Sequence, residues 1–359
     1  MKNPYYDASR PHHRPDGFQN NYQPFAKKKL GELLRWRWQA WRKGPPQMQQ
    51  ALPHVAPELA FIEANAGAGL QMTPAATWIG HITVLLQCAG WNILTDPVFA
   101  QRCSPFQWLG PARRQPPALQ IDQLPPLDLI LLSHNHYDHM DEASLRRLMT
   151  RHSAPPLIVC PLGHRAWFAK RGIFHVHELD WWDSLCLPQQ QARQALEIVL
   201  TPAQHWSSRT PFDAMQALWG GFALFCQDAH LFFAGDTGYS PDFADIRQRF
   251  AARQSARPDG GFDLALLPIG AYEPRWFMQS QHVNPAESVR IFQDLACRQA
   301  LAVHWGTFQL TDEPLDQPPR DLAQALAAAG IAQERFAAVA NGATLRWPRR
   351  WQYGASEAH

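Results

Sequence analysis

Residues 130–141, ILLSHNHYDHMD, contain an apolar strand that runs directly into a cluster of histidine and aspartate. In α/β proteins, strands present functional residues at their carboxyl ends, on loops that a rigid scaffold holds. Imidazole nitrogens and carboxylate oxygens suit zinc in a hydrolytic site. Crowded imidazoles are costly unless a metal or a charged partner organises them. The stretch therefore predicts a metal site rather than a polar turn, and its candidate ligands are His134, His136, Asp138 and His139.

Three more candidate ligands, His205, Asp236 and His304, each follow a predicted strand. Five histidines and two aspartates can form two adjacent metal sites, each with an open position for water. One carboxylate shared by two cations would hold them about 3.5–4 Å apart, and a water between them becomes a nucleophile near neutral pH. We divide the ligands into His134, His136 and His205 for one metal, Asp138, His139 and His304 for the other, and Asp236 as the bridge.

Apolar segments bounded by glycine and proline predict strands along the chain, and amphipathic segments predict helices between them. We expect one domain over residues 71–350 and an N-terminal extension over residues 1–70. The Pro-rich loop at 102–127 is long enough to act as a lid. Strands are predicted at 77–84, 91–96, 129–132, 156–160, 176–182, 197–201, 221–226, 230–234, 263–268, 300–303 and 337–340. Helices are predicted at 57–64, 141–151, 163–171, 285–298 and 319–329.

The N-terminal extension has two parts. Residues 1–24 are polar and predict an irregular arm, whereas residues 25–44, FAKKKLGELLRWRWQAWRKG, carry seven Lys and Arg against one Glu. Apolar residues at helical spacing predict a basic amphipathic helix, which either lies in a membrane interface or packs on the body of the protein. Both alternatives remain open. The apolar stripe consists of Leu30, Leu33, Leu34, Trp38 and Trp41.

Composition narrows the class of protein. The 359 residues are 46% hydrophobic, which supports a sizeable core and excludes global disorder. A net charge of +2 does not suggest a nucleic-acid partner. Six scattered cysteines without a CxxC pair fit a reducing compartment. We expect a cytoplasmic protein, because there is neither a signal peptide nor an apolar run long enough for a transmembrane helix.

The segment SHNHYDHMD (133–141) resembles the HxHxDH signature of the metallo-β-lactamase superfamily. Other segments resemble one branch of it, the zinc-dependent phospholipase D that hydrolyses N-acylphosphatidylethanolamine. The resemblance covers roughly residues 75–310. Its segments are TWIGH (77–81), LTDPVF (94–99), LPPLDLILLSHNHYDH (124–139), ELDWW (178–182), TPAQHW (201–206), LWGGFA (218–223), FFAGDTGY (232–239), FDLALLPIGAYEPRWFM (262–278), QHVNPAE (281–287) and HWGTF (304–308).

The resemblance implies an αββα sandwich, in which two mixed sheets lie face to face with helices outside. It implies two zinc ions per chain with a bridging hydroxide, held by the seven ligands named above, with Asp138 and Asp236 as catalytic carboxylates. Asp96 would then orient the ligands from outside, as such outer partners do. We assign His81 a similar supporting role, because it follows Gly80 near a strand start.

Three residues are predicted to contact substrate. Tyr137 lies between two ligands and cannot point the same way as both neighbours, so we expect it to line the cavity. Gln281 and His282 precede the helix predicted at 285–298, whose N-terminal amides suit a phosphate. The alternative for this pair is a structural turn. Arg275 is expected to form an ion pair with Glu273 rather than bind phosphate, and Trp181 and Trp182 are assigned to the core. His12, His13, His152, His175, His177 and His359 are taken as solvated or incidental.

The predicted activity is phospholipase D-type hydrolysis of N-acylphosphatidylethanolamine to N-acylethanolamine and phosphatidic acid. A phospholipid substrate is compatible with peripheral association of the protein with a membrane. A homodimer is a further open alternative, and no nucleic-acid partner is expected. The alternative is a metallo-hydrolase of a soluble lactone or a small phosphodiester, which would need no lipid groove. A β-lactam hydrolase is disfavoured because a secretion signal is missing. A catalytically dead binding protein is disfavoured because all seven ligands are present.

Overall fold

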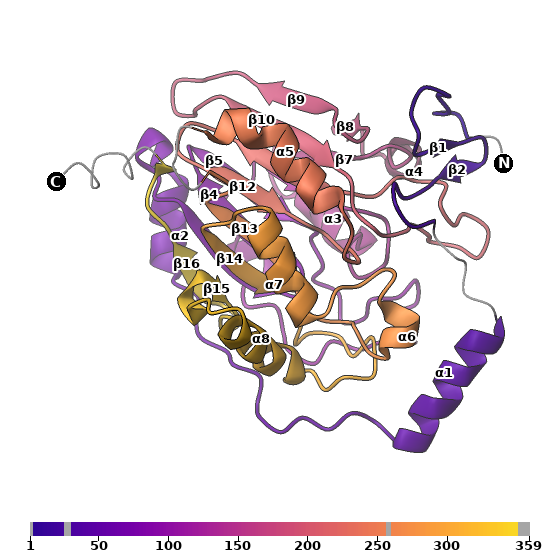
Figure 1. Cartoon of the computed structure of the whole chain (residues 1–359). Coiled ribbons are helices and arrows are strands. Elements are labelled where there is room, and N and C mark those ends of the chain that lie inside the picture. Colours follow the sequence, from indigo (N-terminus) through magenta and orange to yellow (C-terminus); the bar gives the residue numbers. More distant parts are fainter. Residues whose placement is uncertain (1–2, 25–29, 256–259, 351–359) are drawn as a thin grey trace.

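Two mixed sheets pack face to face, and helices cover their outer sides (Figure 1). The structure is a computed structural model that describes residues 3–24, 30–255 and 260–350. Within these ranges, no helix combines the length and the apolar character that a bilayer crossing requires. The two sheets and outer helices confirm the predicted αββα sandwich.

The first sheet has the strand order β16-β3-β4-β5-β6-β7-β8. The pairs from β16 to β5 are antiparallel, whereas the pairs from β5 to β8 are parallel. Parallel pairing requires crossover connections: α3 (Glu142–Thr150) joins β6 to β7, α4 (Arg165–Ala169) joins β7 to β8, and the Pro-rich loop joins β5 to β6. The strands are β3 (Ala75–Gly80), β4 (Thr83–Cys88), β5 (Trp91–Thr95), β6 (Leu129–Leu131), β7 (Leu157–Pro161), β8 (Val176–Leu179) and β16 (Thr344–Arg346).

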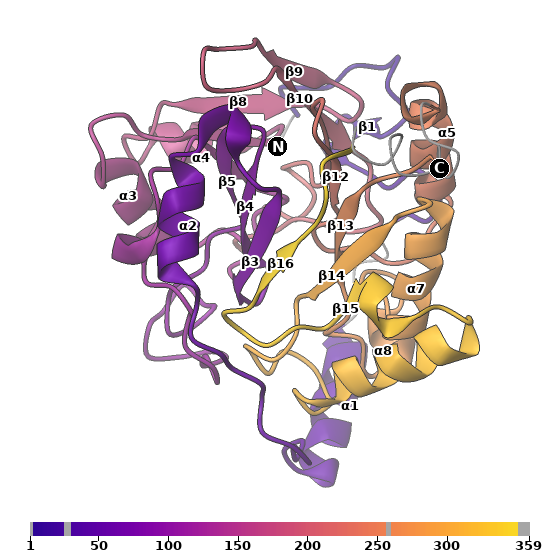
Figure 2. The ribbon, with the colours of Figure 1, turned by 90° about the vertical axis from the view of Figure 1, so that its left-hand side faces the viewer.

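The second sheet has the order β15-β14-β13-β12-β11-β10-β9. Its pairs from β9 to β12 are antiparallel, and those from β12 to β15 are parallel. The strands are β9 (Ser184–Leu187), β10 (Leu196–Thr201), β11 (Gly221–Phe225), β12 (His230–Phe233), β13 (Leu264–Pro268), β14 (Gln299–Val303) and β15 (Phe336–Ala337). Figure 2 shows α2 (Leu59–Ala66), α3 and α4 outside the first sheet, and α5 (Asp242–Gln254), α7 (Pro285–Asp294) and α8 (Gln317–Ala328) outside the second.

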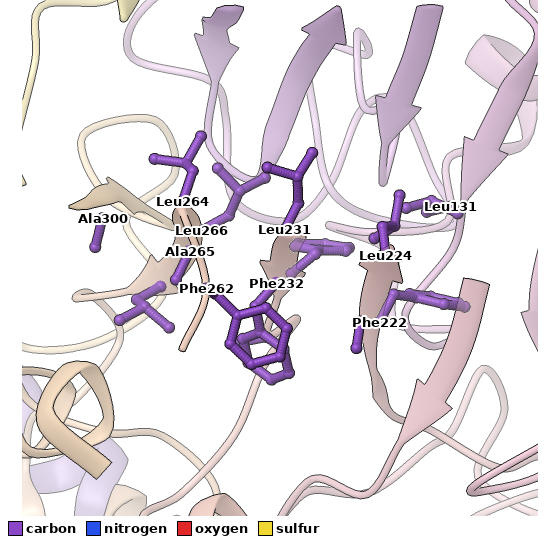
Figure 3. Close-up of a cluster of buried hydrophobic side chains, with 14 of the residues drawn as sticks. Leu131, Phe222, Leu224, Leu231, Phe232, Phe262, Leu264, Ala265, Leu266 and Ala300 are labelled. Carbon is purple, nitrogen blue, oxygen red and sulfur yellow. The ribbon is translucent and has the colours of Figure 1, made fainter. Parts of the chain in front are cut away.

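The apolar core fills the space between the sheets and the space under the helices. Successive side chains of a strand point to opposite faces, so both faces of the second sheet are apolar. Figure 3 shows Leu231, Leu264 and Leu266 close together in this core. Phe232 lies 5.2 Å from Phe262 between ring centroids and also contacts α5. A strand buried on both faces forms a rigid base for the loop that follows it.

Several predicted elements differ from the structure. Residues 77–84 do not form one strand, because the chain turns between β3 and β4 at His81, whose φ is 55°. Strands β9 and β16 and helix α5 were not predicted from the sequence, and α7 ends at Asp294 rather than at residue 298. The turn at Ala89-Gly90 is confirmed between β4 and β5.

The N-terminal residues contact the body of the protein. Residues 3–24 contain the short strands β1 (His13–Arg14) and β2 (Gly17–Phe18). His12 and His13 are buried, and each bonds a carboxylate oxygen of Asp180, at 2.6 and 2.8 Å. The assignment of these two histidines as solvated or incidental is therefore wrong, because they fasten the N-terminal segment to the first sheet's end.

The predicted basic helix is α1 (Leu30–Lys43), and residues 25–29 lie outside the described ranges. None of its residues is buried. Trp36, which is not part of the predicted stripe, packs on Phe277 at 4.8 Å between ring centroids and donates to Asp312. The predicted stripe itself is exposed, so it does not provide the attachment of α1 to the body.

Candidate metal centre

The seven predicted ligands converge at one end of the sandwich, because each follows the carboxyl end of a strand. His134, His136, Asp138 and His139 follow β6 in the first sheet. The other three follow β10, β12 and β14 in the second sheet, and they are His205, Asp236 and His304. The centre therefore forms across the interface between the two sheets.

The ligand atoms fall into two groups. The nitrogens of His134, His136 and His205 lie within 4.8 Å of one another, as do atoms of Asp138, His139, His304 and His81. Asp236 lies between the groups. One of its carboxylate oxygens is 3.1 Å from His139 Nε2 and 3.9 Å from His205 Nε2, and the other is 3.2 Å from His304 Nε2. The two groups contain the residues of the predicted division, with His81 added to the second group, and ligation of two metals with Asp236 as the bridge stays a prediction.

Hydrogen bonds on the far side of two rings test whether these residues suit a cation. His139 donates from Nδ1 to Asp96 at 2.7 Å, and His205 donates from Nδ1 to the carbonyl of Gln281 at 2.9 Å. In the neutral ring, the proton on Nδ1 leaves Nε2 with a lone pair that faces the centre. His139 Nε2 and Asp236 Oδ1 are buried and make no well-aligned hydrogen bond among the described residues, although the Asp236 carboxylate lies 3.1 Å from His139 and 3.2 Å from His304. Such lone pairs and carboxylate oxygens fit a metal.

Asp96 organises the centre from behind. Its side chain is fully buried and accepts hydrogen bonds from the Ser133 amide at 2.7 Å and the Ser133 hydroxyl at 2.5 Å, besides the bond from His139. Burial raises the pKa of Asp96, although the bonds from His139 and Ser133 act in the opposite direction. Asp96, His81 and His304 all adopt positive φ angles of 28°, 55° and 62°. Such strained backbone persists only where the surroundings hold it, and it is typical of functional sites.

The histidines of the two groups titrate differently. Burial holds the pKa of His134 and His136 well below the ordinary value and lowers that of His205 to about 4. Burial also acts to lower the pKa of His304, but Asp236 and Asp138 raise it to about 9. The same carboxylates raise the pKa of His139 well above its ordinary value. Without a metal, protons are therefore favoured on His139 and His304, the histidines grouped with Asp138.

Three of the residues outside the predicted ligand set lie close to the centre. His81 is buried, and its Nε2 is 3.2 Å from an Asp138 oxygen, so it stands as near to the second group as the ligands do. His282 Nδ1 is 3.8 Å from Asp236, and its side chain is partly exposed. Gln281 acts through its backbone carbonyl on His205, while its amide contacts Met278 Sδ. Whether Gln281 and His282 contact substrate stays a prediction.

The Tyr137 hydroxyl donates to the carbonyl of Arg209, whose guanidinium lies 4.1 Å above the Tyr137 ring. Tyr137 therefore ties the ligand loop to the loop after β10, and a role in lining the substrate cavity stays a prediction. Arg275 does not pair its guanidinium with Glu273 as expected. It forms an ion pair with Glu287 at 2.7 Å, because Glu287 is held at the start of α7 by a reciprocal capping interaction with Asn284.

Two residues that support the centre, Ser133 and Asn20, were not predicted from the sequence. Ser133 supplies two hydrogen bonds to Asp96, and it stands next to His134 in the decisive stretch, so its position was a usable signal. Asn20 accepts a hydrogen bond from the backbone of His205 across 185 residues of chain. Nothing in the local sequence around Asn20 indicates that contact.

Comparisons with known proteins identify the family of the chain. Residues 91–305 match the family described as "Beta-lactamase superfamily domain". The chain is 37% identical over 252 residues to N-acyl-phosphatidylethanolamine-hydrolyzing phospholipase D 1 of Caenorhabditis elegans, covering 68% of this chain and 67% of that protein. It is 39% identical over 248 residues to the mitochondrial N-acyl-phosphatidylethanolamine-hydrolyzing phospholipase D of Saccharomyces cerevisiae, covering 68% of this chain but only 50% of that protein.

Solved structures share the fold. The isothiocyanate hydrolase from Delia radicum gut bacteria superposes with a TM-score of 0.59 at 20% identity, covering 76% of this chain and 99% of that chain. The metallo hydrolase Igni18 of Ignicoccus hospitalis superposes with a TM-score of 0.55, also at 20% identity, covering 77% and 98%. The chain therefore belongs to the metallo-β-lactamase superfamily, in the branch that includes the worm and yeast phospholipases, and is a metallo-hydrolase.

Proposed function

We propose that this protein is a two-zinc phospholipase D that hydrolyses N-acylphosphatidylethanolamine to N-acylethanolamine and phosphatidic acid. The observation that supports the proposal is Asp236, whose two oxygens face histidines of both ligand groups. Two metal ions joined by one carboxylate suit hydrolysis of a phosphodiester, which needs charge stabilisation on both the attacking and the leaving oxygen. The substrate comes from the names of the worm and yeast relatives.

The residues of the chain would divide the work as follows. His134, His136 and His205 would hold one zinc ion, and Asp138, His139 and His304 the other. Bound zinc would supply Lewis acidity toward the phosphate and make a water nucleophilic near neutral pH. Asp96 and the Gln281 carbonyl keep protons on the outer ring nitrogens of His139 and His205, so their inner nitrogens stay available. His282, beside Asp236 and partly exposed, is the group we place against the substrate.

A lipid substrate requires contact with a membrane, and two exposed regions support such contact. On α1, Leu30, Leu34 and Trp41 are well exposed, and the helix ends in Arg42 and Lys43. Apolar residues beside basic ones favour an interfacial helix on anionic lipid. In the Pro-rich loop, Phe106, Trp108 and Leu109 are also exposed.

The attachment of α1 places this helix beside the loops of the metal centre. Trp36 packs on Phe277, which belongs to the short helix α6 (Arg275–Met278) just before Gln281 and His282. Arg35 lies 4.9 Å above the ring of Trp276. We therefore propose that α1 brings the membrane surface to the loop that carries His282.

The substrate proposal predicts that the purified protein releases N-acylethanolamine from a defined long-chain N-acylphosphatidylethanolamine. Asp236→Asn should lower this rate at least about a hundredfold, since losing even an outer partner of a ligand typically costs 10–100-fold. The release is measured by mass spectrometry, with Asp122→Asn on the exposed surface as the control. If the protein hydrolyses only a water-soluble diester, the proposed lipid substrate is wrong. If it hydrolyses neither substrate, the proposed phosphodiesterase activity is wrong.

The membrane proposal predicts that Trp38→Ser combined with Trp41→Ser weakens sedimentation with anionic vesicles at least about tenfold, because two exposed aromatic side chains no longer insert. The control is Phe174→Ser, which removes an equally exposed aromatic ring from outside α1. Substitutions are preferable to deleting residues 1–44, because the N-terminal segment packs on the centre. Equal sedimentation of the double variant and the unaltered protein would show that α1 does not bind the membrane.

The role of Asp96 predicts that Asp96→Asn weakens metal binding about 10–100-fold, because His139 loses its charged acceptor. The measurement is titration of the metal-free protein with Zn²⁺ in competition with a chromophoric chelator. Asp122→Asn again serves as the control, since its carboxylate is exposed. An Asp96→Asn variant that binds zinc as tightly as the unaltered protein would show that Asp96 does not tune the ligands.

The raised pKa values of His139 and His304 predict that metal uptake releases protons. With the pKa of His304 at about 9, this ring is protonated at pH 7 in the metal-free protein and must lose a proton to become a ligand, and the raised pKa of His139 acts in the same direction. Metal affinity should therefore fall as the pH drops below about 9. Calorimetry of zinc binding at pH 7, in two buffers of different ionisation enthalpy, counts the protons. Binding without proton release would contradict the assignment of these rings.

A further inference from the structure

We propose that Asn20 is a positioning residue of the metal centre and that the N-terminal segment of residues 3–24 is a structural part of that centre. Asn20 is 3% exposed. Its Oδ1 accepts a hydrogen bond from the backbone amide of His205 at 3.1 Å and another from Trp219 Nε1 at 3.1 Å. Two N–H donors meet at this atom, which requires the oxygen of the amide and not its nitrogen.

The backbone amide of His205 has only a weak alternative partner. It lies 3.2 Å from the carbonyl of Ala203, two residues earlier, and a bond of that span closes a tight turn with poor geometry. A buried amide without a good acceptor is costly. Asn20 therefore supplies the acceptor that this turn lacks. The Gln281 carbonyl fixes the His205 ring at Nδ1, so Asn20 and Gln281 together fix both the backbone and the ring.

The segment around Asn20 is fastened at several points. Before Asn20, Asp180 accepts from His12, His13 and Arg10 at 2.6–2.8 Å. The Phe18 amide donates to the Met215 carbonyl at 2.8 Å. The contacts with Asp180 fasten the segment to the end of β8, and the bond to Met215 fastens it to the loop after β10.

Two further contacts lie on the other side of Asn20. The Asn21 side chain donates to Asp242 at 2.7 Å, and the side-chain amide of Gln204 donates to the backbone carbonyl of Gln23 at 3.1 Å. Gln204 is the residue just before His205, so the segment contacts the ligand turn twice. Because the segment is held independently on both sides, removing the Asn20 amide should not release it.

The family match begins at residue 91, so it does not include this segment. The contact with His205 is thus supplied by a part of the chain outside the matched domain. The inference rests on the metal centre of the proposed function and is independent of the lipid substrate. It assigns to residues 3–24 a task at the His134, His136 and His205 group, which sets this segment apart from α1.

The test uses the full chain with Asn20→Leu, which keeps the shape of the side chain and removes both hydrogen bonds. Metal-free protein is titrated with Co²⁺ against a competing chelator, and the visible absorption of the bound ion is recorded. We expect affinity at one of the two sites to fall about tenfold and its absorption bands to shift, because His205 is displaced. Asn20→Asp keeps an oxygen acceptor for both donors and should restore affinity and spectrum.

Asn21→Ala is the matched control, because it removes a neighbouring hydrogen bond of the same segment that does not reach His205. It should bind Co²⁺ as the unaltered protein does. If Asn20→Leu does not fold, the smaller Asn20→Ala, which also lacks an acceptor, gives the same readout. Affinity and spectrum unchanged in a folded Asn20→Leu or Asn20→Ala variant would overturn the inference. Co²⁺ binding that is absent from the unaltered protein would overturn the metal centre, and this inference with it.

Discussion

The structure depends on one electrostatic constraint, which is that imidazoles and carboxylates are buried together at one end of the sandwich. Burial opposes charge on each group, yet His139 and His304 lie within 3.1–3.2 Å of Asp236. A bound cation would resolve this conflict, because the imidazole lone pairs and the carboxylate oxygens would then bind the cation as ligands. The strained backbone at His81, Asp96 and His304 shows that the surrounding structure holds the groups in place against their local preferences.

The sandwich explains how that constraint is met. Four ligands stand on the loop after β6 of the first sheet, and three stand after strands of the second sheet. The distances within a site whose residues come from two sheets depend on how rigidly the sheets pack against each other. The core of buried leucine and phenylalanine between and outside them provides that rigidity (Figure 3). Asp236, facing histidines from both sheets, is the point at which the two halves meet.

Much of this could be predicted from the sequence, because the signals were local. An apolar strand followed by His134, His136, Asp138 and His139 is a short motif, and each later ligand also directly follows a strand. What the sequence could not supply were contacts between distant segments. His12 and His13 looked incidental because Asp180, which makes them structural, lies 168 and 167 residues away. The turn at His81 was missed because only two residues separate β3 from β4, so apolar residues resume directly after Gly80 and His81.

The N-terminal extension shows why such distant contacts matter for function. Along the α6 loop, Phe277 packs against Trp36 of α1, the Gln281 carbonyl holds His205, and His282 approaches Asp236. A displacement of α1 would therefore act on the same short stretch that orients a ligand. Asn20 reaches His205 from the opposite side, through the backbone. His205 is thus held between two segments of which one precedes the matched domain, so the geometry of this ligand depends on the extension as well as on the sandwich.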